Sequence, residues 1–316
     1  MLQYPNFEII FSLADEQDPA HSIVTELISL FPSVEAKVIV SKRRDDWNPK
    51  VENLVASYAE AKHNWILISD SNVRVEADYL TSLASQLDAN VGVMTSAISG
   101  RNADSLSAKL EATYLNTFYA RWMLLADNFG YPFVIGKSMV FQKKMADRFG
   151  GLKTLGIYLA EDYMTGVAMK HLGMKIVLSR KPVIQHLSKI NFKSFWARHL
   201  RWGRMRKAHA PFVFLTEPFA SSLGSIIFAA PFLSFYAPGL VFKFLCFHFF
   251  SWGLCDFILA KKMDPKTNFT FLFSWILREL SAFPMWIHIL MGNSVSWRGK
   301  NVSLEAWGVI SPGRRA

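Results

Sequence analysis

Carboxylates follow expected strands of the first half of the chain, where they could hold a charged ligand. Asp18 comes after the first such strand, Asp70 after the third, and Asp162 near the start of a later helix. Ligands of parallel sheets bind at the carboxyl ends of the strands. Asp70, followed two residues later by Asn72, could hold Mg²⁺ or Mn²⁺ against a nucleotide diphosphate. Asp162 could then act as general base for an attacking hydroxyl.

Each of these carboxylates also has a purely structural interpretation. Asp18 precedes Pro19 and is a good N-cap with proline at the first helical position. Asp70 could simply turn the chain after a strand, and Glu161 with Asp162 could be favourable charges at a helix N-terminus. Taken singly, each residue favours the structural interpretation. Their combination in one α/β region favours a site.

A basic and aromatic motif supplies a fourth element of chemistry. Arg198, His199, Leu200, Arg201 and Trp202 lie on an expected helix with an apolar stripe. Arginine can neutralise a leaving diphosphate through paired hydrogen bonds, and tryptophan offers a flat face for a sugar or an acceptor. The same residues also suit an amphipathic helix on anionic lipid. The two interpretations are compatible.

The pattern of elements in the first half predicts a sheet covered by helices. Strands are expected at 7–13, 37–40, 65–69, 91–95, 133–141 and 175–178, and helices at 19–31, 50–62, 76–87, 105–126 and 160–172. Such alternation indicates an α/β fold with a mostly parallel sheet. The sequence has no GxGxxG motif and no Walker loop, so a nucleotide must be held in another way.

Composition is uneven along the chain. The 316 residues carry a net charge of +10, and two cysteines exclude a disulfide framework. Eighteen of the 26 phenylalanines follow residue 190, and no acidic residue occurs between Asp162 and Glu217, a span with eleven Lys or Arg. The basic residues adjoin an apolar region and alternate with apolar anchors, which suits acidic lipid and phosphate. We therefore expect an anionic membrane and no nucleic acid as partner.

The Phe-rich tail predicts membrane helices. Residues 218–242 carry no charge over 25 positions, enough to cross a hydrocarbon core of about 30 Å. A second apolar stretch covers 238–260, and a third, 268–292, contains Arg278 and Glu279 at its middle. The third is expected to be re-entrant or to face protein, because a charge at the bilayer centre costs at least ~2.5 kcal/mol. The basic cluster 198–207 before the first span predicts an integral membrane protein with its catalytic domain on the cytoplasmic face.

These patterns predict four regions. Residues 1–190 form an α/β nucleotide-sugar domain, 191–211 a basic amphipathic interfacial helix, 212–293 transmembrane or re-entrant helices, and 294–316 a cytoplasmic tail. The oligomeric state is left open.

At these residues the sequence resembles a known family. Asp18, Asp70, Asp162 and Arg198-x-x-Arg201-Trp202 match the D, D, D, (Q/R)xxRW signature of inverting GT-A glycosyltransferases, and within them the ceramide glucosyltransferases and their bacterial relatives. The resemblance covers nearly the whole chain. Longer sequence motifs strengthen it: Asn48-Pro49-Lys50, Asp70-Ser71-Asn72-Val73-Arg74-Val75, Gly136-Lys137-Ser138-Met139, Leu159-Ala160-Glu161-Asp162-Tyr163 and Ser296-Trp297-Arg298-Gly299-Lys300.

The resemblance implies a GT-A-like fold, a UDP-sugar donor, a divalent cation and a lipid alcohol attacked in one inverting displacement. The residues carried over by position fall into three groups: donor binding by Asp18, Lys50, Asp70 and Arg198; the metal by Asp70 with Asn72; catalysis by Asp162 as base with Arg201 and Trp202. The sugar is expected to be a hexose, most simply glucose, and the acceptor ceramide, as in sphingolipid metabolism.

Two departures from the family pattern motivate alternatives. Asn72 replaces the second acid of a DxD, and Tyr119 stands where animal ceramide glucosyltransferases carry histidine. The chain also starts where the family has already completed a strand and a helix, so we expect a truncated start with weak donor binding. The alternatives are transfer to another lipid alcohol, such as a hopanoid or diacylglycerol, or an impaired membrane protein that only binds sugar nucleotide or lipid.

Overall fold

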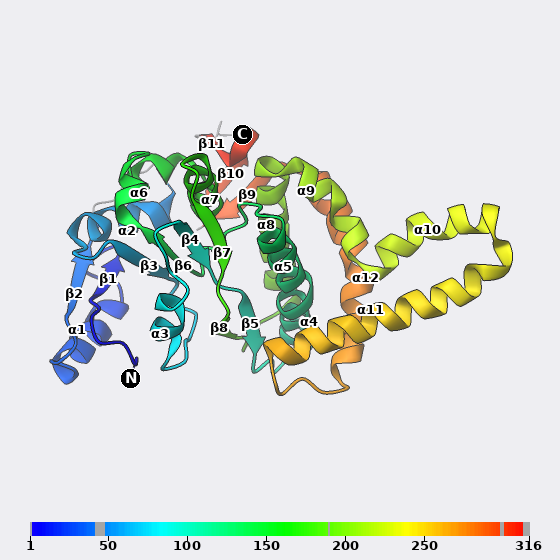
Figure 1. Cartoon of the computed structure of the whole chain (residues 1–316), viewed down its shortest axis with the longest axis horizontal. Coiled ribbons are helices and arrows are strands. Elements are labelled where there is room, and N and C mark those ends of the chain that lie inside the picture. Colours follow the sequence, from blue (N-terminus) through cyan, green and yellow to red (C-terminus); the bar gives the residue numbers. More distant parts are fainter. Residues whose placement is uncertain (1, 42–47, 189, 298–299, 312–316) are drawn as a thin grey trace. The chain divides into compact units, whose positions relative to one another are not determined.

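The computed structural model describes residues 2–41, 48–188, 190–297 and 300–311 (Figure 1). The chain divides into two compact units. The first consists of Met1–Ser71, Val75–Ser96 and Ala126–Lys181, and the second of Asn72–Arg74, Ala97–Leu125 and Pro182–Ala316. The chain therefore passes between the units several times. The four-region scheme expected from the sequence stays a prediction.

The first unit is built on a four-stranded sheet. Its order is β3 (Trp65–Ser69), β6 (Ser138–Gln142), β4 (Val91–Thr95) and β7 (Lys175–Leu178). β6 is antiparallel to both neighbours, and β4 is parallel to β7. Three of the four strands therefore run in one direction, which confirms the prediction of an α/β fold with a mostly parallel sheet. In the same unit β1 (Ile9–Leu13) and β2 (Ala36–Val40) form a separate parallel pair.

Helices connect these strands. They are α1 (Ala20–Leu30), α2 (Pro49–Glu60), α3 (Tyr79–Ala84), α6 (Lys143–Asp147) and α7 (Glu161–His171), with a 3₁₀ helix at Leu152–Ile157. The Asn48 side chain caps α2 by accepting from the Lys50 backbone N–H at 2.9 Å. Val51 of α2 and Phe141 of β6, both 0% exposed, belong to one apolar core. This core fixes the start of α2 against the sheet.

The strand predicted at 133–141 is wrong in its first part, because β6 begins only at Ser138. The backbone N–H of Ile135 donates to the Thr95 hydroxyl oxygen, and that of Gly136 donates to the Asp162 carboxylate. These N–H groups bind side chains and not a neighbouring strand. The segment before β6 is therefore a loop that contributes to the candidate site.

The second unit combines small sheets with long helices. β5 (Ile98–Arg101) pairs in parallel with β8 (Val183–His186), and β9 (Ser294–Trp297), β10 (Lys300–Leu304) and β11 (Ile310–Ser311) form an antiparallel sheet. The helices are α4 (Leu106–Thr113), a π-helical turn Tyr114–Tyr119, α5 (Ala120–Asn128, ending in the first unit), α8 (Phe192–His209), α9 (Pro211–Thr216), α10 (Ser222–Tyr236), α11 (Val241–Met263) and α12 (Phe271–Leu290). Short 3₁₀ helices cover Glu217–Ala220, Pro238–Leu240 and Ala306–Gly308.

α10 and α11 form a long helical hairpin whose tip extends away from α12 (Figure 1). Pro238–Met263 is the one continuous helix, among the described residues, that is long and apolar enough to cross a membrane. The first predicted span, 218–242, is not one continuous helix, because α10 covers only Ser222–Tyr236. Pro211–Ala220 and Ser222–Tyr236 meet at a bend of 80° and are long and apolar enough for a span only if the two count as one.

The third apolar stretch, α12, turns its central charges toward protein. Arg278 and Glu279 are 0% and 1% exposed. Asp256 of α11 accepts hydrogen bonds from Arg278 at 2.6 Å and from Trp275 Nε1 at 2.9 Å, and it also pairs with Arg121 of α5. Glu279 pairs with Arg278 at 2.8 Å and accepts from the Leu223 backbone N–H. We call Arg121, Asp256, Arg278 and Glu279 the buried quartet.

Candidate active site

Asp70, at the carboxyl end of β3, lies between two ammonium groups. Its Oδ1 is 2.9 Å from Lys50 Nζ, and its Oδ2 is 3.5 Å from Lys137 Nζ. Lys50 belongs to the first turn of α2, and Lys137 to the loop before β6, whose carbonyl accepts from the Asp70 backbone N–H. The Asp70 side chain is 29% exposed, so it remains accessible from solvent. The predicted proximity of Lys50 and Asp70 is thus present.

Lys50 also reaches the start of α7. Its Nζ lies 3.3 Å from Glu161 Oε1 and donates to the Gly136 carbonyl at 2.8 Å. Burial disfavours the ammonium, but the negative charges of Glu161, Asp70 and Asp162 outweigh that effect and raise the pKa of Lys50 above its ordinary value. Lys50 therefore stays charged: it pairs with Asp70 and Glu161, and the charge of Asp162 also acts on it.

The Asn48 side chain connects the start of α2 to the start of α7. Besides capping α2, its Nδ2 donates to Glu161 Oε2 at 2.9 Å and to the Tyr158 and Leu159 carbonyls. Asn48 is 0% exposed and Glu161 is 3% exposed. The Asn48 side-chain amide therefore connects the N-terminus of α2 with that of α7. These hydrogen bonds also give the buried Asn48 and Glu161 the polar partners that buried polar groups need.

Asp162 is held by two backbone donors. Oδ2 accepts from the Gly136 N–H at 2.6 Å, and Oδ1 accepts from its neighbour Tyr163 at 2.8 Å. Burial, followed by the charge of Glu161, raises the pKa of Asp162 to about 6 from an ordinary 3.8, against the opposing effect of Lys50 and the two backbone donors. A carboxylate poised in this way suits a general base near neutral pH.

Glycine at position 136 is required by this close approach. A Cβ there would lie 2.7 Å from Lys50 Nζ and 3.0 Å from Asp162 Oδ2. We call the residues Asn48, Lys50, Asp70, Gly136, Lys137, Glu161 and Asp162 the Lys50 cluster. Sequence reasoning assigned no site role to Asn48, Lys137 or Glu161, and it gave Glu161 only a structural interpretation at a helix N-terminus. All three belong to sequence motifs that carried the family resemblance.

Asp18 is not joined to the Lys50 cluster by any described hydrogen bond or ion pair. Its Oδ1 accepts from the Ala20 backbone N–H at 2.9 Å, at the start of α1. This is the capping interaction that was the structural interpretation of the residue. A donor-binding role for Asp18 stays a prediction.

The remaining predicted residues belong to the second unit. Arg198 Nη1 pairs with the buried Glu111 carboxylate at 2.5 Å, and Trp202 packs edge-on against Tyr119 at 5.5 Å between ring centroids. Burial, and then the charge of Arg198, lower the pKa of Arg201. Asn72 also falls in this unit. Their catalytic roles stay predictions.

The described side chains supply only part of a binding site for a divalent cation. No group of three or more His, Cys, Asp or Glu side chains that could hold a metal occurs among the described residues. Mg²⁺, however, is commonly held by one or two carboxylates, with waters and substrate phosphates supplying the other ligands. Asp70, partly exposed beside the ammonium groups of Lys50 and Lys137, is a carboxylate of that kind.

The chain matches known proteins along nearly its full length. The model of glycosyl transferase family 21 matches residues 1–310. Ceramide glucosyltransferase 1 of Caenorhabditis elegans is 30% identical over 312 residues, covering 97% of this chain and 67% of that protein. Ceramide glucosyltransferase of Komagataella phaffii is 25% identical over 401 residues, covering 96% of this chain and 78% of that protein.

The chain is also similar to a solved structure. A mannosyltransferase from Pyrobaculum calidifontis, in complex with GDP-Man and Mn²⁺, aligns with 82% of this chain and 79% of its own, at 16% identity and a TM-score of 0.46. The family model and the curated relatives carry the assignment. The chain belongs to glycosyl transferase family 21 and is a glycosyltransferase.

Proposed function

We propose that the protein transfers glucose from UDP-glucose to the hydroxyl of a ceramide by a single inverting displacement, with Asp162 as base. The observation that carries this proposal is the Lys50 cluster, where Asp162, with a pKa of about 6, shares the Gly136 loop with a lysine that pairs with Asp70 and Glu161. The named ceramide glucosyltransferases among its relatives support the donor and the acceptor.

Asp162 removes the proton of the acceptor hydroxyl. At pH 7 a carboxyl group with a pKa of about 6 is mostly ionised, yet it is a stronger base than an ordinary aspartate. The Gly136 and Tyr163 N–H groups orient both of its oxygens. An inverting displacement needs one base and one stabilised leaving group, and no covalent enzyme intermediate.

Lys50 supports the departing diphosphate. Its ammonium is charged, 24% exposed and bound only to carboxylates and one carbonyl among its described partners. It can exchange Asp70 for a phosphate oxygen when the donor binds, because both are anionic acceptors. Asp70, with Asn72 as a second oxygen ligand, would hold Mg²⁺ or Mn²⁺, which supplies positive charge to the leaving group.

The residues of the RxxRW motif are proposed to act in the same reaction. Arg201 would stabilise the leaving diphosphate, Trp202 would contact the acceptor, and Arg198 would contribute to donor binding, as would Asp18 of the first unit. The half-buried Arg201 supports this role, because a guanidinium in a low-dielectric environment interacts more strongly with phosphate than an exposed one does.

We also propose that the α10–α11 hairpin inserts into an anionic membrane, with the catalytic residues on the cytoplasmic face. Exposed phenylalanines such as Phe232, Phe235 and Phe247 cover the hairpin, 66–82% exposed. Lys261 and Lys262 lie in the last turn of α11, and the basic α8 comes before α9 and α10 in the chain, so basic residues flank the hairpin on both sides in sequence. The positive-inside rule then places both ends of the hairpin in the cytoplasm.

The alternatives differ in their products. Transfer to a hopanoid or diacylglycerol gives another glycolipid, and a protein that only binds sugar nucleotide or lipid gives none. Membranes containing the chain are incubated with a panel of UDP-sugars and lipid alcohols, with Mg²⁺, Mn²⁺ or EDTA. Mass spectrometry then identifies the products. Hexosylceramide from UDP-glucose supports the proposal, and a hexose on other lipids alone contradicts the ceramide assignment.

Membrane insertion is tested with the two cysteines of α11. Cys246 and Cys255 are free and exposed in the structure. An impermeant maleimide should leave both unlabelled in sealed membranes and label both after detergent is added. Rapid labelling of both in intact membranes would contradict insertion.

A further inference from the structure

A cavity lies beside the end of α11, among the end of β5, α4 and the loop that joins α11 to α12. Its volume is about 170 Å³, room for several water molecules, and it is partly open to solvent. All of its lining residues belong to the second unit. We call this cavity the α11 pocket.

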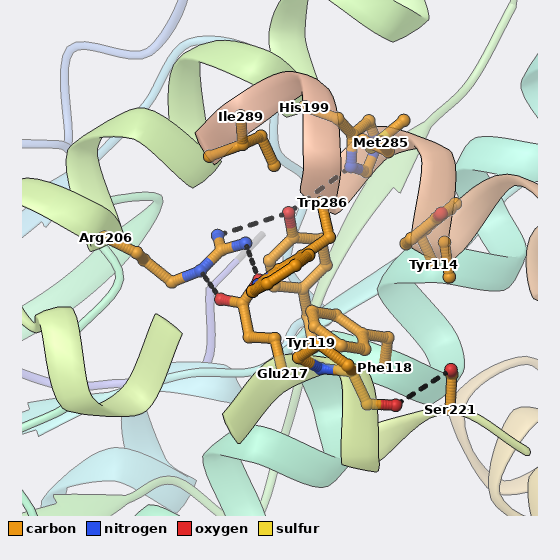
Figure 2. A pocket seen from close by; sticks show the side chains of 12 residues that line it. Tyr114, Phe118, Tyr119, His199, Arg206, Glu217, Ser221, Met285, Trp286 and Ile289 are labelled. Carbon is orange, nitrogen blue, oxygen red and sulfur yellow. Dashed lines mark hydrogen bonds and ion pairs between the residues drawn. The ribbon is translucent and has the colours of Figure 1, made fainter. Parts of the chain in front are cut away.

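The α11 pocket differs from the pocket of Figure 2 in the balance of its charges. The pocket in Figure 2 holds about 30 Å³, little more than one water molecule, and its Arg206 is paired with Glu217. Three basic residues and one acid line the α11 pocket: Arg101, Lys109, Lys266 and Asp264.

The positive charges of the α11 pocket are not neutralised by protein. In the part of the chain that the structure describes, no carboxylate forms an ion pair with Arg101, Lys109 or Lys266. Asp264 accepts from the Lys266 backbone N–H at 3.1 Å, as a turn residue does. The N-terminus of α12, whose first residue Phe271 also lines the pocket, adds to the positive potential. An anion in the pocket would therefore be stabilised.

Arg101 is held in a fixed orientation by the end of α11. Its Nε donates to the Ser99 hydroxyl oxygen at 2.8 Å, and its Nη2 donates to the Met263 carbonyl at 3.2 Å. The Ser99 hydroxyl donates to the same carbonyl at 2.6 Å. Arginine has five N–H donors, so three are not used by these two bonds. An oriented guanidinium with unused donors suits a phosphate group, whose oxygens can accept two parallel hydrogen bonds.

The α11 pocket lies where the proposed membrane hairpin ends. α11 covers Val241–Met263, and the pocket lining continues at Asp264. Phe269, in the same loop, is 80% exposed, and Phe273 and Leu280 of α12 are 61% and 58% exposed. Apolar side chains beside basic ones are typical of a surface that contacts lipid headgroups and the acyl chains next to them. A free phosphate ion would gain nothing from these apolar side chains, whereas a phospholipid can place its acyl chains against them.

We propose that the α11 pocket binds the phosphate group of an anionic membrane phospholipid, with Arg101, Lys109 and Lys266 as its positive partners. The site goes beyond the proposed reaction, because a ceramide acceptor carries no phosphate. Three positive charges against one negative charge favour a phosphomonoester, with a charge of about −1.5 to −2 at pH 7, over a singly charged phosphodiester. The choice of a lipid over a free anion rests on the proposed insertion of the α10–α11 hairpin.

The test is equilibrium binding of dioleoyl phosphatidic acid to the full-length protein in a neutral detergent, measured by native mass spectrometry. Phosphatidic acid should bind about tenfold more tightly than dioleoyl phosphatidylcholine, which is zwitterionic. The double variant Lys109→Gln/Lys266→Gln should weaken its binding about 25-fold, or about fivefold per lysine. Both lysines are exposed, so the variant should keep the fold. Phosphatidic acid should also raise the midpoint of thermal unfolding of the wild type but not that of the double variant.

Lys261→Gln/Lys262→Gln is the matched control, because these lysines lie in the last turn of α11 and do not line the pocket. It should weaken binding less than about twofold, since salt screens exposed charges outside the pocket. Equal weakening by the two double variants, or equal binding of the two lipids, overturns the inference. Displacement of phosphatidic acid by millimolar inorganic phosphate would assign the pocket to a free anion and contradict the lipid. Neither sugar transfer nor membrane insertion enters this measurement, so its failure is distinct from a failure of the proposed function.

Discussion

Two groups of charged side chains, one in each unit, contain similar residue types but differ in net charge and in exposure to solvent. The Lys50 cluster has three carboxylates, Asp70, Glu161 and Asp162, against two ammonium groups. The buried quartet has two acids and two arginines, and its charges cancel. Asp70 is 29% exposed, whereas three members of the quartet are 0–1% exposed.

That difference separates chemistry from scaffold. An excess of negative charge at a partly open edge can accept a cation or a proton, and burial, followed by the charge of Glu161, raises the pKa of Asp162 there. A neutral, closed group can only hold its helices together: the quartet joins α5, α11 and α12 and reaches the start of α10. Replacements in the two groups should therefore act in opposite directions on activity and stability.

The largest effect is expected for Asp162→Asn. Loss of the general base should lower kcat about 1000-fold, measured by transfer of labelled glucose to lipid. The same change should raise the midpoint of thermal unfolding, because the carboxylate is ionised at pH 7 against an unfavourable environment. Glu26→Gln, an exposed acid of α1, is the control for loss of one charge. Retention of full activity would remove Asp162 as base.

Arg278→Met, in contrast, should lower the stability of the protein. Removing Arg278 leaves Arg121 as the one ion-pair partner of Asp256 and leaves Glu279 without an ion pair among the described residues, which costs about 3 kcal/mol of unfolding free energy. Thermal unfolding in detergent measures the loss, and Arg180→Met, an exposed arginine, controls for charge. A stable Arg278→Met protein would contradict a structural role for the quartet.

Activity should depend on pH through Asp162. Its carboxylate must be ionised to act, so kcat should fall as the pH drops below about 6, approaching tenfold per unit. Stability changes in the other direction: the folded state binds the proton more tightly than the unfolded chain, so this group's contribution is present at low pH and is lost as pH rises from about 4 to about 6. A pH–rate profile without an acidic limb near 6 would refute the raised pKa.

Gly136→Ala should give the smallest change. The new Cβ would displace the flexible end of Lys50 and press on Asp162, so kcat/KM for the donor should fall about tenfold. Gly239→Ala is the matched control, since a Cβ there meets no atom within 4 Å. Equal activity of the two variants would show that the close approach at Gly136 is unimportant.

Sequence reasoning predicted the elements with clear periodicity and missed those made by distant contacts. The apolar runs of β3 and β4 were located to the residue. β5 and β8 were missed, because Ile98–Arg101 and Val183–His186 are short and become strands only through each other. The predicted helix 105–126 contains a π-helical turn that no local sequence pattern predicts.

The same distinction applies to the site. Lys50, Asp70 and Asp162 were predicted from recognisable sequence motifs, and the structure brings them together in one cluster. The roles of Asn48 and Glu161 depend on a contact across 113 residues of sequence, and Asn48 on its own is an ordinary helix cap. The quartet's Arg278 and Glu279 were visible as charges in an apolar segment, but their partners Asp256 and Arg121, on other helices, were not predicted.

The stereochemistry of the product tests the central claim most directly. UDP-glucose carries an α-linked sugar, and a single displacement with Asp162 as base inverts that centre. NMR of the glycolipid formed by the wild-type protein should show a β-linked glucose on the ceramide hydroxyl. An α-linked product would require two displacements or a front-face reaction, and it would contradict the role of Asp162 and the mechanism built on the Lys50 cluster.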